Sequence, residues 1–74
     1  MNNDRIISDH RIMLGKPVIK GTRITVESII RKMSEGATLD DILKMYDHLT
    51  KEDVLAVLAY AADAISGEEM VAAA

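Results

Sequence analysis

The residues whose types and spacing most clearly suggest a binding function are basic, and they lie in the first half of the chain. Three of them fall within an eight-residue stretch beside two glycines, whose main-chain amides can approach a phosphate closely. Two more follow on the exposed side of the first predicted helix. Contacts of such side chains with a phosphate backbone would give salt-sensitive nucleic-acid binding. The residues predicted to bind nucleic acid are Lys16, Lys20, Arg23, Arg31 and Lys32.

The same basic stretch is equally typical of a solvated turn whose charges keep a small protein in solution, and the sequence leaves the two interpretations level. A P-loop is excluded, because Walker A requires Gly-Lys-Ser/Thr and here Gly21 is followed directly by Thr22. We therefore expect no nucleotide hydrolysis.

Charge is divided unevenly along the chain. Residues 1–35 contain seven Lys and Arg against four Asp and Glu, a net charge of +3, whereas residues 36–74 contain two against eight, a net charge of −6. Such a division orients one end of a molecule toward anions and the other toward cations. We expect an anionic partner at the N-terminal half and a basic partner at the C-terminal half.

No set of residues with catalytic chemistry is visible in the sequence. The chain has no cysteine, which excludes disulfides, thiolate metal sites and a cysteine nucleophile. His10 and His48 are the only histidines, and neither stands four residues from a second ligand on one helix. Asp40 and Asp41 fit the first turn of a helix better than a cation site. We expect no enzymatic activity, no metal and no cofactor.

The basic residues must be positioned by an irregular N-terminal segment. Residues 1–24 are predicted to form short strands and turns, because brief apolar groups alternate with Asp, Gly and Pro. Gly15-Lys16-Pro17 separates Ile12-Met13-Leu14 from Val18-Ile19, which predicts a small hairpin over residues 12–20 that pairs these two apolar groups. Lys20-Gly21-Thr22-Arg23 is a second turn signal.

Residues 25–66 carry the pattern of three helices. Thr25, Thr38 and Thr50 are predicted N-caps, each followed by acidic residues that complement the helix dipole. The predicted ends are Gly36, the region of Asp47-His48, and Gly67. Apolar residues at helical spacing predict three inward faces: Val26, Ile29, Ile30 and Met33; Leu39, Ile42, Leu43 and Tyr46; and Val54, Val57, Leu58, Ala61, Ala62 and Ile65.

The third predicted helix is apolar around most of its circumference and needs neighbours on more than one side. The 74 residues form a single predicted domain, and a core of this size seldom supplies more than about 3–5 kcal/mol. We therefore predict a homodimer. Residues 67–74 form a tail that fits either a frayed helical extension or disordered chain, and its alanines favour helix. The residues predicted at a partner or dimer interface are Leu55, Ala59, Tyr60, Met70 and Val71.

The run Gly15-Lys16-Pro17-Val18-Ile19-Lys20-Gly21-Thr22-Arg23-Ile24 closely resembles the signature opening of the domain of unknown function 433 family of small prokaryotic proteins. Further segments are similar to the rest of that family's pattern in the same order, so the resemblance covers about residues 5–65. They are Gly36, Thr38-Leu39-Asp40-Asp41-Ile42, Tyr46, Leu49-Thr50-Lys51-Glu52-Asp53-Val54 and Ala59-Tyr60-Ala61. The family usually has proline after this tyrosine, where the chain has Asp47.

The resemblance implies a mainly α fold, a three-helix homeodomain-like or helix-turn-helix bundle with short N-terminal β strands. It also implies an antitoxin-type function beside a nuclease-like toxin, and no catalytic residue. In a helix-turn-helix the second helix reads the major groove. Here that helix begins Lys51-Glu52-Asp53, whose carboxylates would be repelled by phosphates, and its apolar remainder lacks Arg, Asn and Gln for base contacts. We expect it to serve the core and the dimer interface instead.

These features predict an antitoxin-type protein of a prokaryotic toxin–antitoxin pair. The acidic half would block a nuclease-type toxin, and the basic half of a dimer would hold operator DNA. Two alternatives stay open: a stand-alone helix-turn-helix transcription regulator, and a protein-interaction adaptor that never meets nucleic acid. No stretch approaches the roughly 20 apolar residues of a membrane span, and the N-terminus lacks a signal core, so we expect a cytoplasmic protein with no membrane contact.

Overall fold

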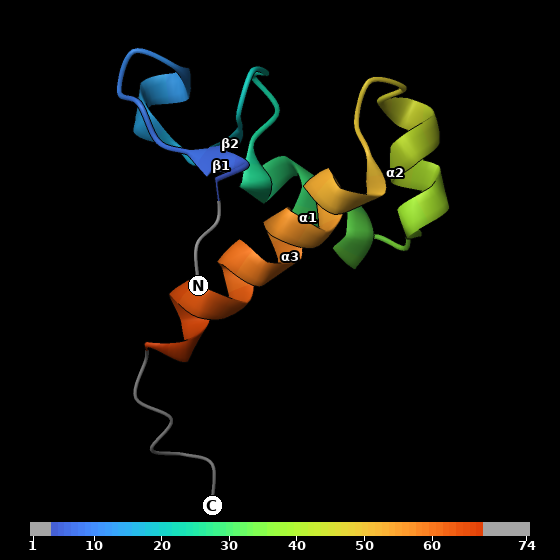
Figure 1. Cartoon of the computed structure of the whole chain (residues 1–74). Helices are drawn as coiled ribbons and strands as arrows, with labels where there is room; N and C mark the ends of the chain where they lie inside the picture. The colour runs from blue at the N-terminus through green and yellow to red at the C-terminus, as the bar shows by residue number, and fades with distance from the viewer. Residues whose placement is uncertain (1–3, 68–74) are drawn as a thin grey trace, which may run out of the picture.

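The computed structural model describes residues 4–67, which fold into a small antiparallel sheet followed by three α-helices (Figure 1). This arrangement confirms the predicted mainly α fold with short N-terminal strands. The elements in chain order are β1 (Ile6–Ile7), the 3-10 turn η1 (Met13–Gly15), β2 (Val18–Ile19), α1 (Val26–Ser34), α2 (Leu39–Met45) and α3 (Lys51–Ser66).

All three predicted helix starts are confirmed by their capping contacts. The Thr25 hydroxyl accepts a hydrogen bond from the Ser28 amide at 3.0 Å. Thr38 and Thr50 each form a capping box, in which the carboxylate three residues later accepts from the threonine amide at 2.9 and 3.0 Å, respectively. These contacts satisfy amides that the first turn of a helix otherwise leaves unpaired.

The helix ends agree with the prediction at α1 and differ at α2. After α1, Gly36 has a φ of +110°, and the Ala37 amide donates to the Lys32 carbonyl at 3.0 Å, as in a Schellman motif. The second helix ends at Met45, slightly before the predicted end near Asp47-His48, because Tyr46 leaves the helical region at φ −124° and ψ 84°.

The predicted hairpin over residues 12–20 is wrong. Val18 and Ile19 pair instead with Ile7 and Ile6, and the intervening Met13–Gly15 segment forms η1. Burial explains the choice of strand partner. Ile6 is 8% exposed and reaches the core, whereas Leu14 lies in the left-handed region at φ +58° with its side chain 92% exposed.

The core lies where the first half of α3 crosses the inner faces of the other elements. Its fully buried side chains include Ile19 of β2, Ile29 of α1, Ile42 of α2, and Val54 and Val57 of α3. The predicted inward faces of α1 and α2 are confirmed, since each contains residues in this core or packed against it.

The predicted inward face of α3 is correct only in its first half. Val54 and Val57 are fully buried, but Leu58 is 38% exposed and Ile65 is 58% exposed. The last turns of α3 extend past α1 and α2 (Figure 1), which leaves the side chain of Ile65 more exposed than that of Leu58. None of the helices within this part of the chain has both the length and the apolar content needed to cross a bilayer.

Candidate nucleic-acid interface

Lys20 and Arg23 flank a tight turn that directly follows β2. The Thr22 hydroxyl donates to the Ile19 carbonyl at 2.8 Å, and Gly21 occupies a φ of +83° that favours glycine. Both basic side chains are exposed, and neither forms an ion pair with a residue between 4 and 67. Their charges are therefore available to an anion in solution.

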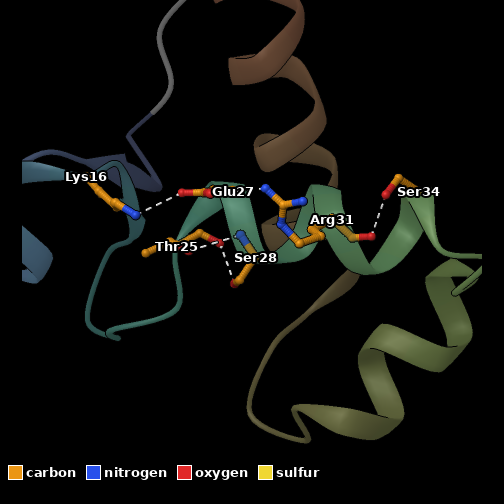
Figure 2. Close-up of polar contacts among 6 residues, drawn as sticks. All are labelled: Lys16, Thr25, Glu27, Ser28, Arg31 and Ser34. Atoms are coloured by element: carbon orange, nitrogen blue, oxygen red, sulfur yellow. Dashed lines mark hydrogen bonds and ion pairs between the residues drawn. The ribbon is translucent and has the colours of Figure 1, made fainter.

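Lys16 and Arg31 lie elsewhere and share one carboxylate, Glu27 in the first turn of α1 (Figure 2). Lys16 Nζ lies 3.0 Å from Glu27 Oε1, and an Arg31 guanidinium nitrogen lies 3.3 Å from Glu27 Oε2. Hydrogen bonds from Lys16 and then Arg31 hold the pKa of Glu27 below its ordinary value. Glu27 is thus ionised at neutral pH and compensates part of the charge of both cations.

A shallow cavity of about 260 Å³ adjoins this cluster along the outer side of α1. Three cations and two carboxylates line it, so a phosphate could bind there only in competition with Glu27. Lys32, the third cation, is half-buried and has no ion pair within the described residues. The full lining is Met13, Lys16, Thr25, Glu27, Ser28, Arg31, Lys32 and Glu35.

The five predicted nucleic-acid-binding residues therefore fall into two groups. Lys16, Arg31 and Lys32 surround the cavity, whereas Lys20 and Arg23 lie on the turn after β2. Glu27, which pairs with two cations of the first group, was not among the residues predicted from the sequence. Its spacing of four from Arg31 signals one of the two ion pairs. The contact with Lys16 arises only when β2 and α1 come together.

Two further cations of the basic half are already paired. The Arg11 guanidinium donates to both carboxylate oxygens of Asp9, at 3.1 and 2.8 Å, and lowers the pKa of that carboxyl. An Arg5 nitrogen lies 2.9 Å from Asp53 Oδ1, at the start of α3. Neither arginine was predicted to bind nucleic acid, and both are engaged within the fold.

The segment 46–50 joins α2 to α3 in the outline of a helix-turn-helix. The start of α3, which would read bases in that geometry, is occupied by intramolecular contacts. Asp53 accepts from the Thr50 amide at 3.0 Å as well as from Arg5. Burial raises the pKa of Asp53, but these hydrogen bonds outweigh it and hold the pKa below its ordinary value. Asp53 therefore keeps its negative charge at the point where a phosphate backbone would approach.

The predicted interface residues on α3 have different surroundings. Leu55 is 47% exposed on the outer face. Ala59 and Tyr60 are half-buried, and Tyr60 packs against the core. Met70 and Val71, like the proposed helical tail, lie outside the described residues.

Neither histidine is part of a cluster of metal ligands within residues 4–67. His10 is exposed, and His48 Nδ1 lies 3.8 Å from the carboxylate of its neighbour Asp47. Within residues 4–67, no group of three or more His, Asp or Glu side chains is placed to hold a metal ion.

The fold and these surfaces define a small, mainly α three-helix bundle that carries a basic N-terminal turn. The sequence profile described as "Protein of unknown function (DUF433)" matches residues 6–61, and the chain belongs to this family. A crystal structure of a DUF433 member protein from Anabaena variabilis superposes with a TM-score of 0.80 at 27% identity, covering 84% of this chain and 61% of that one. The chain thus spans about three fifths of the length of that protein.

A second relative is an uncharacterised protein from Archaeoglobus fulgidus. It is 54% identical over 28 residues, which cover 38% of this chain and 78% of the relative. Neither description states what the protein binds or does.

Proposed function

We propose that the protein is an antitoxin-type module without enzymatic activity that contacts DNA phosphates and blocks a basic nuclease. The observation that carries the DNA contact is the turn after β2, where exposed Lys20 and Arg23 have no carboxylate partner within residues 4–67. The uneven distribution of charge along the sequence supports the same assignment. Phosphate contacts of this kind position a protein on DNA and make its binding depend on salt.

The nuclease contact rests on the acidic second half of the chain. Asp40, Asp47, Glu52 and Asp63 are exposed on α2, on α3 and between them. Complementary charge speeds encounter with a basic partner and selects its orientation more than it sets affinity. We assign the affinity to apolar residues of the tail, Met70 and Val71, which lie outside the described residues.

The DNA contact is tested by titrating a labelled duplex of the sequence upstream of the coding region at low and moderate salt. We expect binding that weakens steeply with salt and a Lys20→Ala/Arg23→Ala variant with about tenfold or greater loss of affinity. Lys44→Ala on α2 is the matched control, since it removes an exposed lysine outside the basic half. If no binding is seen at either salt concentration, the remaining alternative is a protein-interaction adaptor that does not bind nucleic acid.

The helix-turn-helix regulator is distinguished by a substitution at the start of α3. If α3 reads the major groove, Lys51→Glu abolishes DNA binding and the double variant of the turn does not. In the mechanism proposed here the double variant has the greater effect.

The nuclease contact is tested by co-expression with the product of the adjacent reading frame. We expect the full chain to co-purify with that product and a chain ending at Gly67 to lose it. If removal of residues 68–74 leaves co-purification unchanged, the tail does not supply the affinity. If the neighbour is not a nuclease and does not co-purify, the antitoxin role fails and DNA binding is judged by the titration alone.

A further inference from the structure

A stripe of apolar side chains runs along the outer face of α3. Leu55, Leu58, Ala62 and Ile65, the outer stripe, follow one another at intervals of three, four and three residues. This is the spacing of the a and d positions of a coiled coil, so the four side chains share one side of the helix. Val54 and Val57, which are fully buried, face the core from the adjacent side.

Residues 4–67 leave the outer stripe open to solvent. Leu55, Leu58 and Ile65 are 47%, 38% and 58% exposed, and Ala62 is also exposed. These three are half of the six large exposed hydrophobic residues in the described part of the chain. Apolar side chains gathered on one face favour contact with another protein surface over solvent. The half-buried Ala59 beside the stripe is small enough to allow a second helix to approach closely.

We propose that the outer stripe binds the same stripe of a second copy of this chain, with the two α3 helices antiparallel. An interface with two-fold symmetry must be self-complementary, so that residue i contacts j and j contacts i. The outer stripe meets this condition, because its spacing reads the same in both directions about residue 60. Leu55 then lies against Ile65 of the partner copy, and Leu58 lies against the smaller Ala62, each contact occurring twice.

Charge favours the antiparallel arrangement of the two helices. α3 has no basic residue in its last turn, so its C-terminal partial negative charge is not compensated from within the helix. Lys51 is exposed and lies one turn before Leu55 on the line of the outer stripe. In an antiparallel pair it reaches the C-terminal end of the partner helix. A parallel pair would instead bring the two helix N-termini together, with their like partial charges side by side and Lys51 facing Lys51.

Dimerisation through the outer stripe goes beyond the proposed function, and it can be measured on the protein alone. Sedimentation equilibrium of the full chain over an about hundredfold concentration range is expected to show a monomer–dimer equilibrium. Leu58→Glu and Leu55→Glu each weaken dimerisation at least about tenfold, because each buries two unpaired carboxylates in the interface. Met45→Glu is the matched control, since Met45 is an apolar residue that is 52% exposed on α2 and not part of the outer stripe. Circular dichroism checks that each variant is folded.

A monomer at every concentration overturns the proposal, as does a dimer that both stripe variants leave intact. Loss of co-purification with the nuclease in stripe variants of a monomeric wild-type chain would assign the stripe to that partner instead. If the protein proves not to bind DNA, the test of dimerisation is unaffected, because the sedimentation experiment contains no DNA.

The orientation is tested by oxidation of single-cysteine variants, for which the cysteine-free chain gives no background. Leu55→Cys and Ile65→Cys are mixed, with one of them labelled with ¹⁵N so that the disulfide products differ in mass. Antiparallel pairing predicts the mixed disulfide. Two copies of position 55 would lie about 15 Å apart along the axis, beyond the reach of a disulfide. Disulfides joining identical variants would overturn the antiparallel arrangement.

Discussion

The side chains of Arg5 and Asp53 lie 2.9 Å apart, although 48 residues separate them in the sequence. Asp53 also closes the capping box of α3 by accepting from the Thr50 amide. One carboxylate therefore starts the longest helix and fastens the segment before β1 to it. The Asp53 side chain is 13% exposed and the Arg5 side chain 51%, so the pair lies at the edge of the core.

We expect Asp53→Ala to lower the free energy of unfolding by about 1–2 kcal/mol, since it removes both a cap and an ion-pair partner. Arg5→Ala removes only the ion pair at a partly exposed site and should cost about 0.5 kcal/mol. Urea denaturation measures both. Asp47→Ala is the control, because that side chain is 99% exposed and takes no part in capping. Equal losses for Arg5→Ala and Asp53→Ala would contradict the double role of Asp53.

Stability should decrease in acid through the capping carboxylates. Burial raises the pKa of Asp53, but the hydrogen bonds from Thr50 and Arg5 hold it below the ordinary value of 3.8. A carboxyl with a lowered folded pKa stabilises fully above its unfolded pKa, and this contribution is lost as pH falls through the folded value. The urea concentration at the unfolding midpoint should therefore decrease as the pH is lowered below about 4. The decrease should be smaller in Asp53→Asn. If the pH dependence is unchanged in that variant, Asp53 does not contribute to the loss of stability in acid.

Glycine is required at two positions because of the backbone conformation there, and not because a larger side chain would clash with its neighbours. Gly21 and Gly36 have φ values of +83° and +110°, and a Cβ added at either would meet no atom within 4 Å. We expect Gly21→Ala and Gly36→Ala each to cost about 1 kcal/mol in urea denaturation. Gly67 has a φ of −77°, so Gly67→Ala should leave stability unchanged or raise it slightly. A similar loss at all three positions would contradict the conformational explanation.

Glu27→Gln should strengthen DNA binding if the proposed function is correct. The substitution leaves Lys16 and Arg31 without the carboxylate that now lies 3.0 and 3.3 Å from them. Each cation that gains a phosphate steepens the plot of log affinity against log salt by about one unit. Titrations at several salt concentrations measure this slope, with Asp63→Asn as a control that removes an exposed carboxylate on α3, outside the cavity and its ion pairs. An unchanged slope would show that the cavity does not contact DNA.

The helices could be predicted from the sequence because their signals are local. Thr25, Thr38 and Thr50 cap helices through residues three positions later, and Gly36 ends α1 through its own backbone. The strand partner of Val18 could not be predicted locally, because it depends on whether Ile6 or Leu14 can reach a core assembled mostly from later residues.

The candidate site was predictable in its residue types but not in its grouping. The basic stretch identified Lys16, Lys20 and Arg23 together, yet the fold places Glu27 against Lys16 and leaves the other two unpaired within residues 4–67. The exposed half of α3 was also missed. Its periodicity resembles that of a buried helix, and only the length of α3 relative to α1 shows that the core ends before the helix does.

The attachment of the N-terminal segment has a consequence for how the molecule opens. β1 is only two residues long, and the Lys20 amide donates to the Arg5 carbonyl at 2.6 Å just beyond it. The contacts that hold this segment each close a long loop, whereas the hydrogen bonds of α1 and α3 are local. Brief partial unfolding should therefore release the first strand while the helices persist, and solvent deuterium should reach the amide of Lys20 before that of Ile29.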